Sequence, residues 1–240
     1  MRRPAATDLL DLWERASHCG PHERALRLMA WALPDQDVEA LADLDLGLRD
    51  WHLLRLRSAL FGTALAGYTD CPHCGERLEL ELDARALQDE APLPQAPHYL
   101  SNDGYRFRLP SGRDLIAIAN LDDTDAAARE LFTRCHLNGS EADGGVTTLT
   151  IDDAAFDEID NGLAALATER SLQLALACAV CGEAWQLTFD PCTFLWKEIE
   201  ARAIALLDDV HQLASTYGWS ESEILALGDT RRAAYLSRVN

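Results

Sequence analysis

Lysine is nearly absent from this sequence of 240 residues, and positive charge is scarce overall. Lys197 is the one lysine, and 21 basic residues stand against 40 acidic ones, which gives a formal net charge of −19 at pH 7. A surface with this charge repels phosphate backbones and anionic lipid, so roles on nucleic acid or at a membrane surface are disfavoured. The remaining composition, 48% apolar with 14 Gly and 9 Pro, is that of a globular chain large enough to bury a core.

Long apolar runs are missing as well. No stretch approaches the roughly 18 residues that a membrane-spanning helix needs. Arg2 and Arg3 stand near the first residue, but Asp8, Asp11 and Glu14 interrupt the apolar stretch that an export signal requires. We therefore expect the chain in a reducing cytoplasm. In that compartment, paired cysteines indicate metal ligands or redox centres before disulfides.

Motifs of the common enzyme classes are also absent. The sequence has no His-Glu-x-x-His, no Gly-x-Ser-x-Gly and no phosphate-binding glycine loop, and it lacks the zinc-deaminase signature. We expect no catalytic residues and no enzymatic activity. An enzyme with an unrecognised site stays open as an alternative.

The most informative feature is a repeated cysteine motif. Cys71-Pro-His-Cys-Gly-Glu76 recurs 107 positions later as Cys178-Ala-Val-Cys-Gly-Glu183. Each copy continues with apolar residues at every second position, over 77–83 and 184–190, and residues 172–177 alternate in the same way before the second copy. Alternation with a period of two is typical of a half-buried strand, so we predict the order strand, Cys-x-x-Cys turn, strand.

Two such turns facing each other supply four soft ligands for a tetrahedral metal site. We predict that Cys71, Cys74, Cys178 and Cys181 bind one structural zinc ion per chain. The 103 residues between the pairs exceed the spacing of about 15–20 in a zinc ribbon, which implies an inserted subdomain. Two buried knuckles without metal are the alternative. A thioredoxin-like redox centre is disfavoured, because these motifs lead into strands rather than a helix.

The other candidate ligands have simpler interpretations. Cys19, Cys135 and Cys192 lie in or near helical patterns, where a cysteine is usually a small core residue. His73 lies inside the first motif, but Val180 takes its place in the second copy, so we expect His73 not to bind the metal.

Hydrophobic periodicity predicts an α+β fold with helices at both ends. The expected parts are a helical segment over 1–62, a small zinc-ribbon-like β unit formed by 63–83 and 171–190, an inserted α/β subdomain over 84–170, and a C-terminal helical segment over 191–240.

The inserted subdomain is predicted to combine a hairpin with two helices. An alternating pattern over 105–109 and an apolar run over 115–118 favour two strands, joined by a turn at Pro110-Ser-Gly-Arg113. Helical periodicity covers residues 123–136 and 153–168.

Two groups of segments in this sequence resemble those of a known protein family. The first is Leu60-Phe-Gly62, the first cysteine motif and Leu109-Pro-Ser-Gly-Arg-Asp-Leu115. The second is Phe194-Leu-Trp-Lys-Glu-Ile199, Val210-His-Gln-Leu-Ala214, Tyr217-Gly-Trp-Ser-Glu221, Glu223-Ile-Leu225, Arg231-Arg232 and Tyr235-Leu236. Over roughly residues 50–238, the chain resembles baseplate hub assembly proteins of T-even-type contractile phage tails and related contractile injection systems.

The resemblance implies a non-enzymatic assembly chaperone or structural component that binds hub or spike proteins of a contractile particle and can be incorporated into it. It also implies that the cytoplasm is that of a bacterium or a phage-infected host. The candidate partner-binding residues are Tyr217, Trp219, Arg231, Arg232 and Tyr235, which are of types enriched at interface hot spots. An alternative is that Trp219 only packs a helix end and the arginines form a solvated face.

A second class of function is a zinc-ribbon adaptor that binds the transcription or nucleic-acid machinery. The net charge of −19 and the lack of a basic cluster disfavour it.

Overall fold

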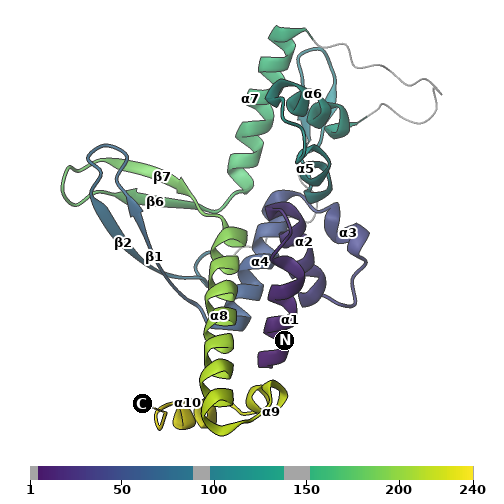
Figure 1. Cartoon of the computed structure of the whole chain (residues 1–240). Helices are drawn as coiled ribbons and strands as arrows, with labels where there is room; N and C mark the ends of the chain where they lie inside the picture. The colour runs from purple at the N-terminus through teal and green to yellow at the C-terminus, as the bar shows by residue number, and fades with distance from the viewer. Residues whose placement is uncertain (1–4, 89–97, 138–151, 240) are drawn as a thin grey trace.

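The computed structural model describes residues 5–88, 98–137 and 152–239 and shows an α+β chain arranged around one long helix (Figure 1). This helix, α8, covers Pro191–Tyr217, a length of about 40 Å. Pro191 lies in its first turn, where a missing N–H costs no hydrogen bond. The Asp190 side chain accepts hydrogen bonds from the backbone of Cys192 and Thr193, and this cap fixes the start of the helix.

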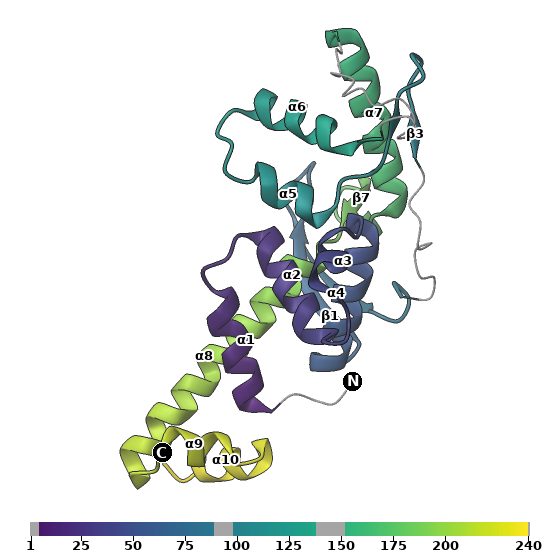
Figure 2. The same cartoon turned by 90° about the vertical axis from the view of Figure 1, so that its right-hand side faces the viewer.

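Four helices from the first part of the chain form a bundle with α8, in which the first, second and fourth pack against α8 and the short third one packs against the second (Figure 2). They are α1 (Ala6–Ala16), α2 (Pro21–Ala32), α3 (Val38–Ala42) and α4 (Leu46–Phe61). Their apolar faces enclose a core with α8 in which Leu28, Leu53 and Ile199 are fully buried. We call this part of the molecule the helical body.

Two antiparallel hairpins project from the helical body and approach each other at their tips (Figure 1). The first pairs β1 (Ala64–Asp70) with β2 (Arg77–Asp83), and the second pairs β6 (Gln173–Ala177) with β7 (Ala184–Thr188). In both hairpins the cysteine motif forms the turn between the strands. They are separate two-stranded sheets, although they share this construction.

A buried arginine fixes the base of the first hairpin. The Arg57 guanidinium at the end of α4 donates to the carbonyl oxygens of Gly62 and Ala64, at 2.9 and 2.7 Å, and pairs with Glu198 of α8. Leu65 and Ala84 pack beside it in a small core that also contains Leu54, so the base of this hairpin is anchored to both helices.

The insert between the hairpins has a core of its own, which contains Phe107, Phe132 and Ile159. A three-stranded sheet in the order β3-β4-β5 lies on one side of it, next to three helices. The elements are β3 (Tyr99–Leu100), β4 (Arg106–Phe107), α5 (Gly112–Ile118), α6 (Thr124–Cys135), β5 (His136–Leu137) and α7 (Asp153–Arg170).

The hairpin predicted over 105–109 and 115–118 is wrong in its second strand, because Gly112–Ile118 forms helix α5. Ser111 begins this helix with a capping box: its hydroxyl accepts from the Asp114 N–H, and the Asp114 carboxylate accepts from the Ser111 N–H. An apolar run of four residues is too short to distinguish a strand from a helix, and the cap decides between them. The strand that pairs with β4 in a hairpin is instead β3.

The insert is tied to the helical body independently of the hairpins. Arg170 at the end of α7 donates to both carboxylate oxygens of Asp45, the N-cap of α4, at 2.8 Å each. Both side chains are about nine-tenths buried, so this bidentate pair is a firm joint between the two parts.

The C-terminal end of α8 turns back through two short helices, α9 (Glu221–Leu225) and α10 (Asp229–Leu236), as Figure 1 shows. Gly218 takes the left-handed conformation, with φ of 69°, that ends α8. Ser220 and Glu223 then form the capping box of α9. None of the helices in the described ranges is both long and apolar enough to cross a membrane.

Candidate metal centre

The two Cys-x-x-Cys turns have the same backbone geometry. The N–H of Cys71 donates to the Glu76 carbonyl at 2.8 Å, and the N–H of Cys178 donates to the Glu183 carbonyl at 2.7 Å. Gly75 and Gly182 have φ of 73° and 77°, a conformation that glycine adopts without strain. The repeated Gly-Glu after each cysteine pair is therefore part of the turn itself.

The tips of the hairpins bring all four predicted cysteines together, although the two pairs are far apart in the sequence. Their sulfur atoms all lie within 4.8 Å of one another. Across the hairpins, Cys71 Sγ is 3.7 Å from Cys181 Sγ, and Cys74 Sγ is 3.7 Å from Cys178 Sγ. We call this group the cysteine cluster, and it could hold a metal ion.

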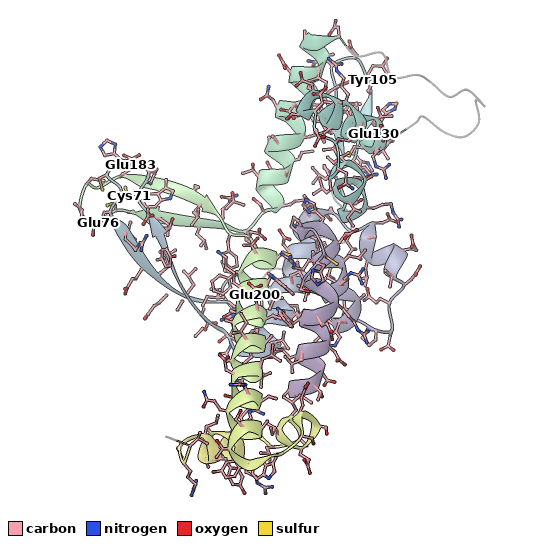
Figure 3. The ribbon with its side chains drawn as sticks, in the orientation of Figure 1. Cys71, Glu76, Tyr105, Glu130, Glu183 and Glu200 are labelled. Atoms are coloured by element: carbon pink, nitrogen blue, oxygen red, sulfur yellow. The ribbon has the colours of Figure 1, made fainter. Side chains whose placement is uncertain are left out.

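The cysteine cluster is asymmetric in its exposure to solvent. The first cysteine of each motif is buried, and the second is exposed. Figure 3 shows Cys71 at the tips of the hairpins, between the labelled Glu76 and Glu183. Both glutamates are exposed, so the surroundings of the cluster are acidic and open to solvent on one side.

Backbone N–H groups prepare one sulfur for metal binding. The N–H groups of Cys181 and Val180 point at the Cys178 sulfur and lower the pKa of this thiol to about 7. Because the thiolate is the form that binds metal, the cluster presents an ionised ligand near neutral pH. Four thiolates around one ion also fill a tetrahedron and leave no position for a substrate.

Sulfur contacts are the main link between the two hairpins. In the ranges that the structure describes, no backbone hydrogen bond joins β1 or β2 to β6 or β7. The contacts within hydrogen-bonding distance between them are the two sulfur pairs of the cysteine cluster. A bound ion would therefore hold together two elements that are otherwise anchored only at their bases.

The remaining cysteines lie away from the cluster. Cys135 is buried in the core of the insert and Cys192 in the core of the helical body, and burial raises the pKa of each thiol to about 11. Cys19 is half-buried just after α1. His73 is exposed and is not part of the metal-binding group found among the described residues.

The predicted partner-binding residues separate into two groups. Tyr217, Trp219 and Tyr235 form one aromatic cluster at the end of α8, with ring centroids 4.7, 4.8 and 5.7 Å apart. Tyr217 is 37% exposed, and the other two are half-buried. Arg231 is exposed, whereas Arg232 is 2% exposed and pairs with Asp209 and Asp229. Arg232 is thus a structural joint between α8 and α10.

One cavity was not expected from the sequence. It lies between α1 and α2 and is lined by charged side chains and Trp31. A sequence pattern could have indicated this cavity. In each of the two helices an arginine follows an acidic residue by four positions, at Asp11–Arg15 and Glu23–Arg27.

Comparison of the chain with models of known families, with curated proteins and with solved structures returned no match.

Proposed function

We propose that this protein is a non-enzymatic assembly or structural component of a contractile tail or injection-system baseplate, and that a structural zinc ion stabilises it. The observation that carries the proposal is the pairing of a four-cysteine cluster, which has no free coordination position, with an aromatic cluster at the far end of α8. Such a combination suits a protein that holds partners rather than one that transforms a substrate.

The distances in the cysteine cluster support zinc as the metal. A Zn–S bond of about 2.3 Å gives a tetrahedron whose sulfur atoms are about 3.8 Å apart. The two cross-hairpin distances of 3.7 Å agree with this edge. The exposed second cysteines allow the ion to enter from solvent, while the buried first cysteines exclude water from the other side.

The aromatic cluster supports a protein partner. Aromatic side chains carry much of the binding energy at interfaces, because they bury a large area and lose little conformational entropy. The net charge of −19 favours a partner with a basic or mixed-charge face, and this charge accelerates their encounter. A hub or spike protein with such a face is the proposed partner.

A pull-down with co-expressed tail proteins tests the proposal. We expect a hub or spike component to be retained at about 50 mM salt and to be lost progressively toward about 300 mM, because salt screens attraction between exposed charges. Failure to retain any tail component at low salt contradicts the proposed function.

A substitution separates binding from folding. Trp219→Ala should weaken retention by about 30-fold, the loss of roughly 2 kcal/mol expected at a hot spot, while the melting temperature changes little. Tyr68→Ala is the control, since Tyr68 is 67% exposed but lies on β1, away from α8's end. If retention falls only in proportion to a lower melting temperature, Trp219 packs a helix end and does not contact the partner.

A further inference from the structure

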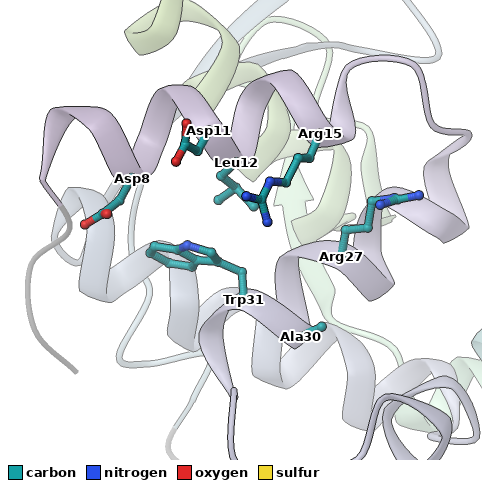
Figure 4. A pocket seen from close by; sticks show the side chains of 7 residues that line it. All are labelled: Asp8, Asp11, Leu12, Arg15, Arg27, Ala30 and Trp31. Carbon is teal, nitrogen blue, oxygen red and sulfur yellow. The ribbon is translucent and has the colours of Figure 1, made fainter. Parts of the chain in front are cut away.

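The helical body contains a cavity between α1 and α2 that is lined by charged and apolar side chains and is well separated in sequence from the cysteine and aromatic clusters. Its volume is about 340 Å³, within the range of small-ligand sites. Leu12, which is 4% exposed, and the half-buried Trp31 supply its apolar surface. We call this cavity the α1–α2 pocket (Figure 4).

Two arginines of this pocket have no partner. Arg15 and Arg27 are exposed, and neither makes an ion pair, a side-chain hydrogen bond or a ring contact within the described ranges of the chain. Each follows a carboxylate by four positions on its own helix, Asp11 and Glu23, a spacing that often gives a surface ion pair. In a chain with 40 acidic and 21 basic residues, two unpaired guanidinium groups at one cavity point to an external anion.

The opposite end of the pocket is negative. Asp8 and Asp11 line it, and Asp11 makes no hydrogen bond or ion pair to the rest of the described chain. Figure 4 shows Asp11 on α1 above the Trp31 ring and Asp8 beyond one edge of the ring, with Arg15 extending into the space between the helices and Arg27 directed away from it. The pocket is therefore dipolar, with an apolar and aromatic surface between its two charged ends.

The spacing of the charges sets the length of a complementary ligand. Asp8 and Arg15 are seven positions apart on α1, which corresponds to about 10 Å along the helix axis. An extended peptide spans about 3.3–3.6 Å per residue, so a segment three residues long, with a cationic group at one end and an anionic group at the other, matches this distance. A free amino acid, with both charges on one carbon atom, is too short.

We propose that the α1–α2 pocket binds an extended peptide segment that carries, in order, a basic residue, an aromatic or aliphatic residue and a carboxylate. Arg15, which extends into the pocket, binds the carboxylate, because the guanidinium fork matches its geometry, and Arg27 adds positive charge at the same end. Trp31 and Leu12 contact the apolar side chain, and Asp8 and Asp11 bind the basic one. The carboxylate belongs either to a chain end or to an acidic side chain.

Calorimetric titration of the intact protein with short peptides tests this site. We expect acetyl-Lys-Phe-Gly with a free carboxylate to bind saturably. Its C-terminal amide, and the peptide with norleucine in place of lysine, should each bind at least about tenfold more weakly, since each loses a charge-assisted contact. Free phenylalanine should bind as weakly as these two. Acetyl-Lys-Phe-Glu with an amidated C-terminus separates the two sources of the carboxylate. If it binds as well as acetyl-Lys-Phe-Gly with a free carboxylate, the pocket accepts an acidic side chain, and if it binds weakly, the pocket requires a chain end.

Variants locate the binding to this pocket. The double variant Arg15→Gln, Arg27→Gln should lose at least about tenfold in affinity with an unchanged melting temperature, because both side chains are exposed. Arg85→Gln, at an exposed arginine beyond β2, should bind like the wild type. The inference is overturned if no peptide binds at millimolar concentration or if the amide of acetyl-Lys-Phe-Gly binds as well as its acid. It is also overturned if the double variant binds acetyl-Lys-Phe-Gly as tightly as the wild type does.

Discussion

Loss of one cysteine from the cluster should release the metal and open the hairpins without unfolding the helical body. Cys74→Ser is the suitable change, because Cys74 is exposed and its sulfur makes little packing contribution. Cys178→Ser, at the buried sulfur that approaches Cys74 at 3.7 Å, should lose the metal equally. Cys135→Ser and Cys192→Ser are matched controls, because both lie in other cores and should keep one ion per chain.

The size and location of the effect follow from the geometry. Structural zinc sites in small peptides have apparent binding free energies of about 10–16 kcal/mol. An isolated two-stranded hairpin is marginally stable at best, and within the described ranges these two hairpins share no backbone hydrogen bond. The helical body and the insert have separate cores and are joined by the Asp45–Arg170 pair, so they do not depend on the ion.

Hydrogen exchange with zinc analysis measures both parts of this prediction. Amide protection in the hairpins over 64–83 and 173–188 should fall at least about 100-fold, or roughly 3 kcal/mol, while protection in α2, α4 and α8 is kept. The helical circular dichroism should stay close to that of the wild type. The reasoning is refuted if Cys74→Ser keeps its zinc at unchanged affinity, if Cys135→Ser loses it, or if α8 loses protection together with the hairpins.

Two further predictions concern stability. Burial alone would raise the pKa of Asp114, but hydrogen bonds from Arg108 and Ser111 outweigh it and hold this pKa well below its ordinary value. The stabilisation from the ionised Asp114 side chain is therefore complete above about pH 4 and is lost as the pH falls toward the folded-state pKa. Asp114→Asn should cost about 3 kcal/mol in urea unfolding at pH 7, and the difference from wild type should narrow as the pH falls below about 4. Gly47→Ala should cost about 1–3 kcal/mol, because the new Cβ would lie 2.6 Å from the Arg170 carbonyl oxygen. At Gly20 a new Cβ would meet no atom within 4 Å, so Gly20→Ala should cost less than about 1 kcal/mol in the same urea unfolding measurement. Equal losses of stability at the two glycines would contradict the close approach at Gly47.

The local elements could be predicted from the sequence, because the signals that specify them are short. Ser220-x-x-Glu223 and Gly218 mark the end of α8 and the start of α9, and both act within a few residues. The two Cys-x-x-Cys-Gly-Glu motifs fix two identical turns by the same kind of local geometry. Where the local signal was weak, at Leu115–Ile118, the prediction of a strand was wrong and the capping box at Ser111 gave a helix.

Contacts between distant segments were decided only by the tertiary structure. The sequence supplies four cysteines of suitable chemistry, but it does not state that Cys71 meets Cys181 and that Cys74 meets Cys178. That pairing requires α4 and α8 to hold the bases of the two hairpins so that their tips meet. This arrangement depends on the packing of residues that are more than 100 positions apart in the sequence.

Which side chains are buried was also decided only by the tertiary structure. Arg231 and Arg232 are adjacent and chemically identical in the sequence, yet one is exposed and the other is 2% exposed between Asp209 and Asp229. Among the residues that the structure describes, the fold also leaves Arg15 and Arg27 without partners, although carboxylates precede both on their helices. The sequence by itself determined the turns, the helices and the kinds of ligand; the tertiary structure decided which side chains meet, because meeting depends on how whole elements pack.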